Sequence, residues 1–204
     1  MILKTHPENP NSRHIRRAIE ALEAGELIAY ATDTVYGLGC DIHNKQAMER
    51  ALALKGYAKT HALSFLCADL SDISKYARVS TPAYKIMKHC VPGAFTFILP
   101  ASREVPRLLL TKRQTVGIRV PDNAVCRTLL KDFGRPILST SVTSRTGELL
   151  TDPDLIESEW QHEIAVILDS GPLNNVPSTV VDLTDDAAGP VIVRAGKGDP
   201  AMLR

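Results

Sequence analysis

The spacing of apolar side chains alternates along this chain between a helical period and short continuous runs. Residues 12–25 repeat apolar positions at helical spacing, with Ser12 as the expected N-cap and Gly25 as the expected terminator. Residues 26–32, ELIAYAT, form a continuous apolar run, which is typical of a strand covered on both faces. A helix followed by a buried strand is what the opening of an α/β domain looks like.

The rest of the chain continues this alternation and then ends in a cluster of strands. Residues 1–11 form an extended lead-in, and residues 105–111 fit neither pattern. This order favours one α/β (α+β) domain over residues 1–204, with a mixed sheet rather than a purely parallel one. The further expected helices are 44–56, 70–77, 82–90, 122–134 and the end of 144–160, and the further expected strands are 62–67, 91–101, 115–121, 135–141, 163–171, 178–184 and 190–196.

Composition narrows the class of protein without naming a function. The 204 residues are 44% hydrophobic but only 5% aromatic, so we expect a mostly aliphatic core. The net charge of +1 gives no global excess that would indicate nucleic acid or a membrane surface. The N-terminus lacks the apolar segment of a signal peptide, and no apolar run approaches the ~20 residues of a membrane span. We therefore expect a cytoplasmic protein.

Cysteines and glycines supply no familiar cofactor motif. Cys40, Cys67, Cys90 and Cys126 are far apart and form no CxxC pair, so we expect reduced thiols and no metal site. The stretch GLGCDI at 37–42 lacks the third glycine of a dinucleotide fingerprint, and no phosphate-binding P-loop, nucleophile elbow or HExxH is present. In the surrounding ATDTVYGLGC, the glycines are expected to turn the chain sharply after a strand.

Hydroxyl and charged side chains stand where several predicted strands and one helix end. Each has a plainer explanation when taken alone: a threonine packs in strands, Arg119 could pair with Asp122 or another carboxylate, and two lysines could form a solvated helix end. Taken together, they predict a cleft for an acidic, phosphate-bearing ligand. The residues are Thr32, Asp33, Thr34, Lys55, Lys59, Arg119, Ser139, Thr140, Ser141, Ser178, Thr179 and Arg194.

Ordered segments that contain these residues resemble the YrdC/YciO family, whose best-known activity is threonylcarbamoyl-AMP synthase. ATDTVYGLGCDI resembles PTETVYGLGCD, PGAFTFILPA resembles PGPVTFVL, and TVGIRVPDN resembles VAVRVPDH. PILSTSVTSRTGE is similar to PLVSTSANLSGE, PSTVVDLT to ESTVVDL, and VIVRAGKG to ILRPGAI. The resemblance covers about residues 15–198 and implies a twisted, mostly open sheet of the YrdC type with a concave basic cavity.

The resemblance also implies a reaction and a set of partners. L-threonine, bicarbonate or CO2, and ATP with Mg2+ would give threonylcarbamoyl-AMP and pyrophosphate, which serve a tRNA modification. Thr34, Arg119, Ser139 and Thr179 would contact threonine, and Lys55 would bind the phosphates and stabilise the departing pyrophosphate. Lys55, Lys59, Ser141, Thr143 and Arg194 would hold ATP, and no protein metal site or tightly bound cofactor is implied.

Two positions depart from the synthase pattern and place the chain with the YciO branch. The K-x-R motif reads Lys55-Gly56-Tyr57, and S-x-N reads Ser141-Val142-Thr143, so a cation and an amide are missing. Lys59 is a candidate substitute cation.

These departures predict weak or altered synthase activity. They also leave a second hypothesis open: a protein that binds double-stranded RNA, tRNA or rRNA without turnover. That binding would use the same cleft together with Arg16, Arg17, Lys112 and Arg113.

Overall fold

Ten strands pair into one mixed sheet in this computed structural model, which describes residues 1–54, 63–110 and 113–203. The strands are β1 (Ile2–Lys4), β2 (Leu27–Tyr30), β3 (Gly37–Asp41), β4 (Ser64–Leu66), β5 (Phe95–Pro100), β6 (Thr115–Arg119), β7 (Ile137–Ser141), β8 (Ile164–Asp169), β9 (Thr179–Asp182) and β10 (Val191–Arg194). Their order is β1-β8-β2-β3-β7-β4-β6-β5-β9-β10. Parallel pairs such as β2/β8 and β5/β9 occur beside antiparallel pairs such as β3/β7, which confirms the expected α/β fold with a mixed sheet.

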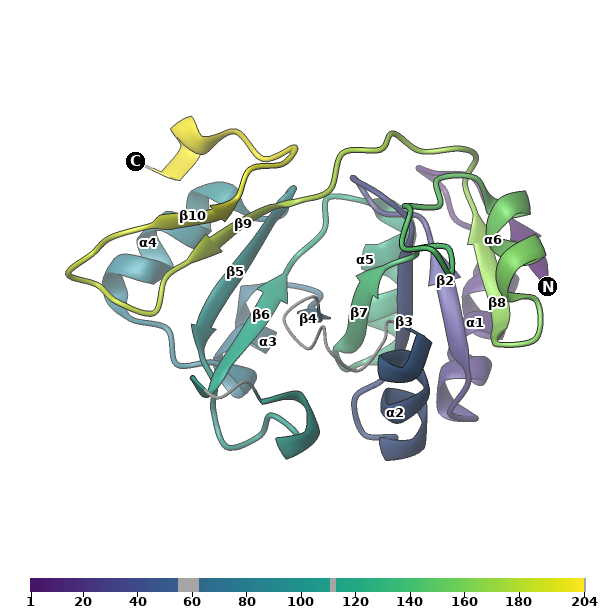
Figure 1. Ribbon diagram of the computed structural model, residues 1–204, viewed down its shortest axis with the longest axis horizontal. Helices are drawn as coiled ribbons and strands as arrows, with labels where there is room; N and C mark the ends of the chain where they lie inside the picture. The colour runs from purple at the N-terminus through teal and green to yellow at the C-terminus, as the bar shows by residue number, and fades with distance from the viewer. Residues whose placement is uncertain (55–62, 111–112, 204) are drawn as a thin grey trace.

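The sheet is bent into an arch, as Figure 1 shows. The short strand β4 joins β7 on one side and β6 on the other. Strands β5, β6, β9 and β10 lie on one side of the arch, and β7, β3, β2 and β8 lie on the other. Because every pair of strands adds twist of one hand, a long sheet can bring strands that are distant in its order face to face.

Side chains at the helix ends explain where several helices begin and stop. Asn11, not the predicted Ser12, caps the first helix by accepting a hydrogen bond from the backbone N of Arg13 at 2.9 Å. Asn123 caps the fifth helix, which ends at Gly134 with a φ of 72°. The helices are α1 (Ser12–Glu23), α2 (Lys45–Leu54), α3 (Leu70–Tyr76), α4 (Thr81–Cys90), α5 (Ala124–Phe133) and α6 (Pro153–Trp160), with 3-10 helices η2 (Arg107–Leu109) and η3 (Pro200–Leu203).

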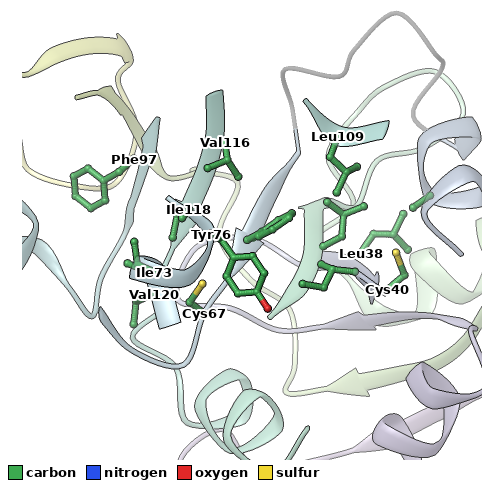
Figure 2. Packing of buried hydrophobic residues seen from close by; sticks show 14 of the residues in the cluster. Leu38, Cys40, Cys67, Ile73, Tyr76, Phe97, Leu109, Val116, Ile118 and Val120 are labelled. Carbon is green, nitrogen blue, oxygen red and sulfur yellow. The ribbon is translucent and has the colours of Figure 1, made fainter. Parts of the chain in front are cut away.

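Helices cover both faces of the sheet, as the continuous apolar run of β2 predicted. Ile28 and Tyr30 enter a buried cluster with α1 and α5, whereas Leu27 and Ala29 point into a larger cluster on the other face. Figure 2 shows part of this larger cluster, in which Tyr76 lies near Cys67.

Two strands were not expected from the sequence. The lead-in contains β1, which pairs with β8 in parallel. The prediction of a sharp turn at Gly37 and Gly39 is wrong, because both residues belong to β3 and pair with β2 and β7. A Cβ on Gly37 would lie 2.7 Å from the Tyr30 ring, and one on Gly39 would lie 2.8 Å from it. These glycines therefore make room for an aromatic ring rather than for a turn.

The four cysteines lie in the core. Cys40, Cys67, Cys90 and Cys126 are free and buried. Burial raises the pKa of the Cys40 thiol to about 12, which keeps it protonated and unreactive at neutral pH. Among the described residues, every helix is too short or too polar to cross a membrane.

Gly39→Ala is expected to destabilise the protein by about 1–3 kcal/mol, because the new methyl group overpacks the core. Its Cβ would lie 2.6 Å from Cγ2 of Ile137 as well as against Tyr30. Equilibrium denaturant unfolding measures the change. On an Ile137→Ala background the same substitution should cost less, since part of the space is free. Equal stability of Gly39→Ala and the parent protein would contradict this packing role.

Candidate functional site

A tight hydroxyl turn follows β2. Oγ1 of Thr32 donates to the carbonyl of Val35 at 2.7 Å and accepts from the backbone N of Thr34 at 3.0 Å. The two threonine hydroxyl oxygens are 3.0 Å apart, and both side chains are buried. This local network holds the backbone of residues 32–35 in one conformation and fixes the direction of the intervening Asp33.

Asp33 forms a buried ion pair with Arg119 at the end of β6. Nη2 of Arg119 donates to Oδ1 of Asp33, and the two side chains are only 8% and 11% exposed. The alternative partner, Asp122, instead pairs with Arg127 at 3.3 Å. Within the described part of the chain, the buried Nε of Arg119 has no hydrogen-bond partner. Arg119 therefore keeps a donor that a ligand oxygen would satisfy.

Ser139 lies on β7 beside a phenol that the sequence analysis did not select. The hydroxyl of Tyr30 donates to Oγ of Ser139 at 2.7 Å, and Tyr30 is fully buried. Burial raises the pKa of the Tyr30 phenol far above its usual value, so it acts as a neutral donor. The Ser139 hydroxyl keeps its own proton for another acceptor.

The C-terminal strands bring a second guanidinium to the same region. Nη2 of Arg194 donates to the carbonyl of Ser178 at 2.8 Å and to its Oγ at 3.3 Å, and that Oγ lies 2.9 Å from Oγ1 of Thr96. Desolvation lowers the pKa of Arg194, and the positive charge of Arg119 lowers it further.

Thr179 organises the segment that follows Arg194. Its Oγ1 donates to the carbonyl of Gly198 at 2.7 Å and accepts from the backbone N of Gly196 at 3.0 Å. The residue is 0% exposed, so this geometry gives it the role of holding the segment. Its predicted contact with threonine stays a prediction. Between the two glycines, Nζ of Lys197 donates to the backbone carbonyl of Asp33 at 2.5 Å.

Two cations thus contact Asp33 in the loop after β2, Arg119 through the carboxylate and Lys197 through the backbone carbonyl. Asp33 is the carboxylate that pairs with Arg119, whereas Arg194 and Lys197 contact only neutral oxygens among the described residues. This arrangement leaves two positive charges without a counterion in the described part. Uncompensated cations at strand ends favour an anionic ligand.

The predicted contacts of Ser141 and Thr143 with ATP stay predictions. Ser141 pairs with Gly37 across β7 and β3, and the carbonyl of Thr143 accepts from Nε1 of Trp160 at 2.8 Å. Lys55 and Lys59, like Tyr57 and Lys112, lie outside the described residues.

Sequence reasoning missed two contributors, Tyr30 and Lys197. Tyr30 was hidden in an apolar run. Lys197 carried a signal that could have been used, because it follows a strand end and stands between two glycines.

A protein metal site is not evident in the described part of the chain, where no three His, Cys, Asp or Glu side chains gather into a possible ligand set. The site instead offers guanidinium, ammonium and hydroxyl groups, which bind oxyanions directly.

The sequence matches a family model and several known proteins. A family model for Sua5, YciO and YrdC proteins, described as "Telomere recombination", matches residues 20–196. A Haemophilus influenzae protein is 45% identical over 199 residues, covering 96% of this chain and 95% of its own length. YciO of Escherichia coli K12 is 43% identical over 196 residues, covering 95% of this chain and 94% of its own length. A threonylcarbamoyl-AMP synthase of Pseudoalteromonas translucida is 32% identical over 173 residues, covering 82% and 92%.

Solved structures show the same relationship in three dimensions. The crystal structure of E. coli YciO has a TM-score of 0.94 at 41% identity, covering 100% of this chain and 99% of its own. The structure of P. abyssi Sua5 complexed with L-threonine has a TM-score of 0.85 at 29% identity. The match covers 96% of this chain and 57% of the Sua5 chain. Both the family model and the closely similar YciO fold lead to one conclusion. This chain belongs to the Sua5/YciO/YrdC family.

Proposed function

We propose that this protein is an ATP-dependent enzyme of the threonylcarbamoyl-AMP synthase type. It would use L-threonine, bicarbonate or CO2, and ATP to make threonylcarbamoyl-AMP and pyrophosphate for N6-threonylcarbamoyladenosine modification of tRNA. The observation that carries the proposal is that Arg119 and Lys197 both contact Asp33, while Arg194 and Lys197 have no carboxylate partner among the described residues. The synthase relatives and the threonine complex of Sua5 support the choice of substrates.

The proposed chemistry needs charge placement rather than a covalent nucleophile. Threonine's amine adds to CO2 and loses a proton to give a carbamate. A carbamate oxygen attacks the α-phosphorus of ATP, forming a new P–O bond while the bond to pyrophosphate breaks. Both reactants are anions, so nearby cations lower the cost of bringing them together. Mg2+ would enter with the ATP phosphates as part of the substrate.

Each residue of the site has a role in this proposal. The threonine carboxylate would share Arg119 with Asp33, taking the buried Nε that lacks a partner in the described residues. Ser139, held by Tyr30, would donate to the same ligand. Arg194 would face the nucleotide, and Lys55 would stabilise charge on pyrophosphate.

RNA binding is the second hypothesis from the sequence, and the described contacts favour it less. Arg17 on α1 pairs with Glu20 at 3.1 Å, and Arg113 pairs with Asp182 of β9 at 3.3 Å. Both cations therefore already have carboxylate partners, and they lie on different parts of the fold. A basic face for RNA phosphates would need such charges to be free and adjacent.

The direct test incubates the purified protein with ATP, Mg2+, threonine and labelled bicarbonate. Labelled threonylcarbamoyl-AMP and an equal amount of pyrophosphate are expected, detected by chromatography and mass spectrometry. Lys55→Ala is the control, and its product should fall to background because charge on the leaving group is no longer stabilised. Product at background with the parent protein would refute the synthase proposal.

Arg119→Lys is expected to raise KM for threonine about 10- to 100-fold, because lysine keeps the charge but loses the planar fork. KM for ATP should change little. The matched control is Arg127→Lys, which alters an exposed pair with Asp122. Steady-state kinetics at saturating ATP measure both variants. An unchanged KM for threonine in Arg119→Lys would remove this residue from the carboxylate site.

Restoring both synthase residues tests the departures from the family pattern. Tyr57→Arg with Thr143→Asn is expected to raise kcat about tenfold or more, because a missing cation and a missing amide return. The single variants separate the two contributions. If the double variant turns over no faster than the parent protein, these positions do not limit the reaction.

A further inference from the structure

We propose that Lys197 is a ligand-binding residue that contacts a phosphate oxygen of the anionic ligand. This inference rests on the proposed function and adds a residue that the sequence analysis did not select. Its starting point is the contact between Nζ of Lys197 and the backbone carbonyl of Asp33. The carboxylate of the same residue, Asp33, binds the buried guanidinium of Arg119. The Lys197 ammonium and the Arg119 guanidinium therefore contact two groups of one residue.

The backbone of Lys197 is held before any ligand arrives. Its own N donates to the carbonyl of Pro177 at 2.8 Å, and Thr179 binds the glycine on each side. A Cβ on Gly196 would lie 2.3 Å from the carbonyl oxygen of Pro177, and one on Gly198 would lie 2.8 Å from that of Ala94. Both glycines are therefore needed for the close approach of this segment to the start of β9 and β5. A fixed backbone lowers the entropy lost when the side chain binds a ligand.

The ammonium of Lys197 is available for an anion. An ammonium has three donors, and the described contact uses one of them on a neutral carbonyl. Lys197 forms no ion pair among the described residues, and the residue is exposed. Arg119, in contrast, is buried and already shares its charge with Asp33.

This difference assigns the two cations to different parts of one ligand. The buried planar guanidinium suits a carboxylate, which it can bind through two parallel hydrogen bonds. The exposed ammonium is a compact point charge on a flexible stem, which suits a phosphate oxygen. Lys197 therefore faces the phosphate end of the ligand, while Arg119 faces the carboxylate end.

The test compares Lys197→Gln and Lys197→Arg with the parent protein by isothermal titration calorimetry, using ATP, pyrophosphate and threonine as separate probes. Glutamine can still donate to the Asp33 carbonyl but carries no charge. Lys197→Gln should bind ATP and pyrophosphate about tenfold more weakly, because a charge-assisted hydrogen bond is lost. Lys197→Arg should bind them nearly as well as the parent. Threonine binding and the melting temperature should be unchanged in both variants.

The matched control is Lys4→Gln, an exposed lysine on β1 at the opposite edge of the sheet, which should bind every probe like the parent. If the parent binds ATP and pyrophosphate but Lys197→Gln binds them equally well, the Lys197 inference fails alone. If Lys197→Gln loses threonine affinity or melts earlier, Lys197 is structural and the inference also fails. If the parent binds neither ATP nor pyrophosphate, the proposed function fails together with it.

Discussion

The buried ion pair between Asp33 and Arg119 holds together parts of the sheet that three strands separate. Asp33 follows β2 and Arg119 ends β6, with β3, β7 and β4 between them in the sheet order. Breaking such a pair by removing one partner costs about 3–5 kcal/mol, because the other charge stays buried and unpaired. The curvature of the sheet and the position of the cations therefore depend on each other. The arch brings the two side chains together, and their pairing favours the arch.

The C-terminal segment contacts the same residue, Asp33, through its backbone carbonyl. Thr179 fixes the glycines around Lys197, and the Lys197 ammonium then reaches the backbone of Asp33. The loop after β2 is thus held by Arg119 of β6, and the Lys197 ammonium contacts its backbone. The cost of placing Arg119 and Lys197 at one residue is offset by the backbone carbonyl and the carboxylate of Asp33. That arrangement leaves positive charge for a ligand.

Much of this could be predicted from particular residues. The apolar run of β2 indicated a strand covered on both faces, and the strand-end position of Arg119 indicated a buried cation that needs a partner. An ion pair of Arg119 with Asp122 or another carboxylate was one interpretation of the sequence, and the structure shows that the carboxylate is Asp33, far away in the sequence. The glycines of β3 were also misinterpreted. Glycine before a cleft and glycine beside a large ring look alike in sequence, and only the position of Tyr30 separates them.

The sequence by itself determined the periodicity of the elements, the mixed α/β class and the kinds of side chain that collect at strand ends. Those properties depend on local spacing and residue chemistry, which can be read directly from the amino-acid sequence. Only the tertiary structure decided which strand ends meet and which cations keep a free donor. Those outcomes depend on the twist that accumulates over ten strands, which brings β6 and the segment after β10 to the loop after β2. Lys197 becomes part of the site for this reason.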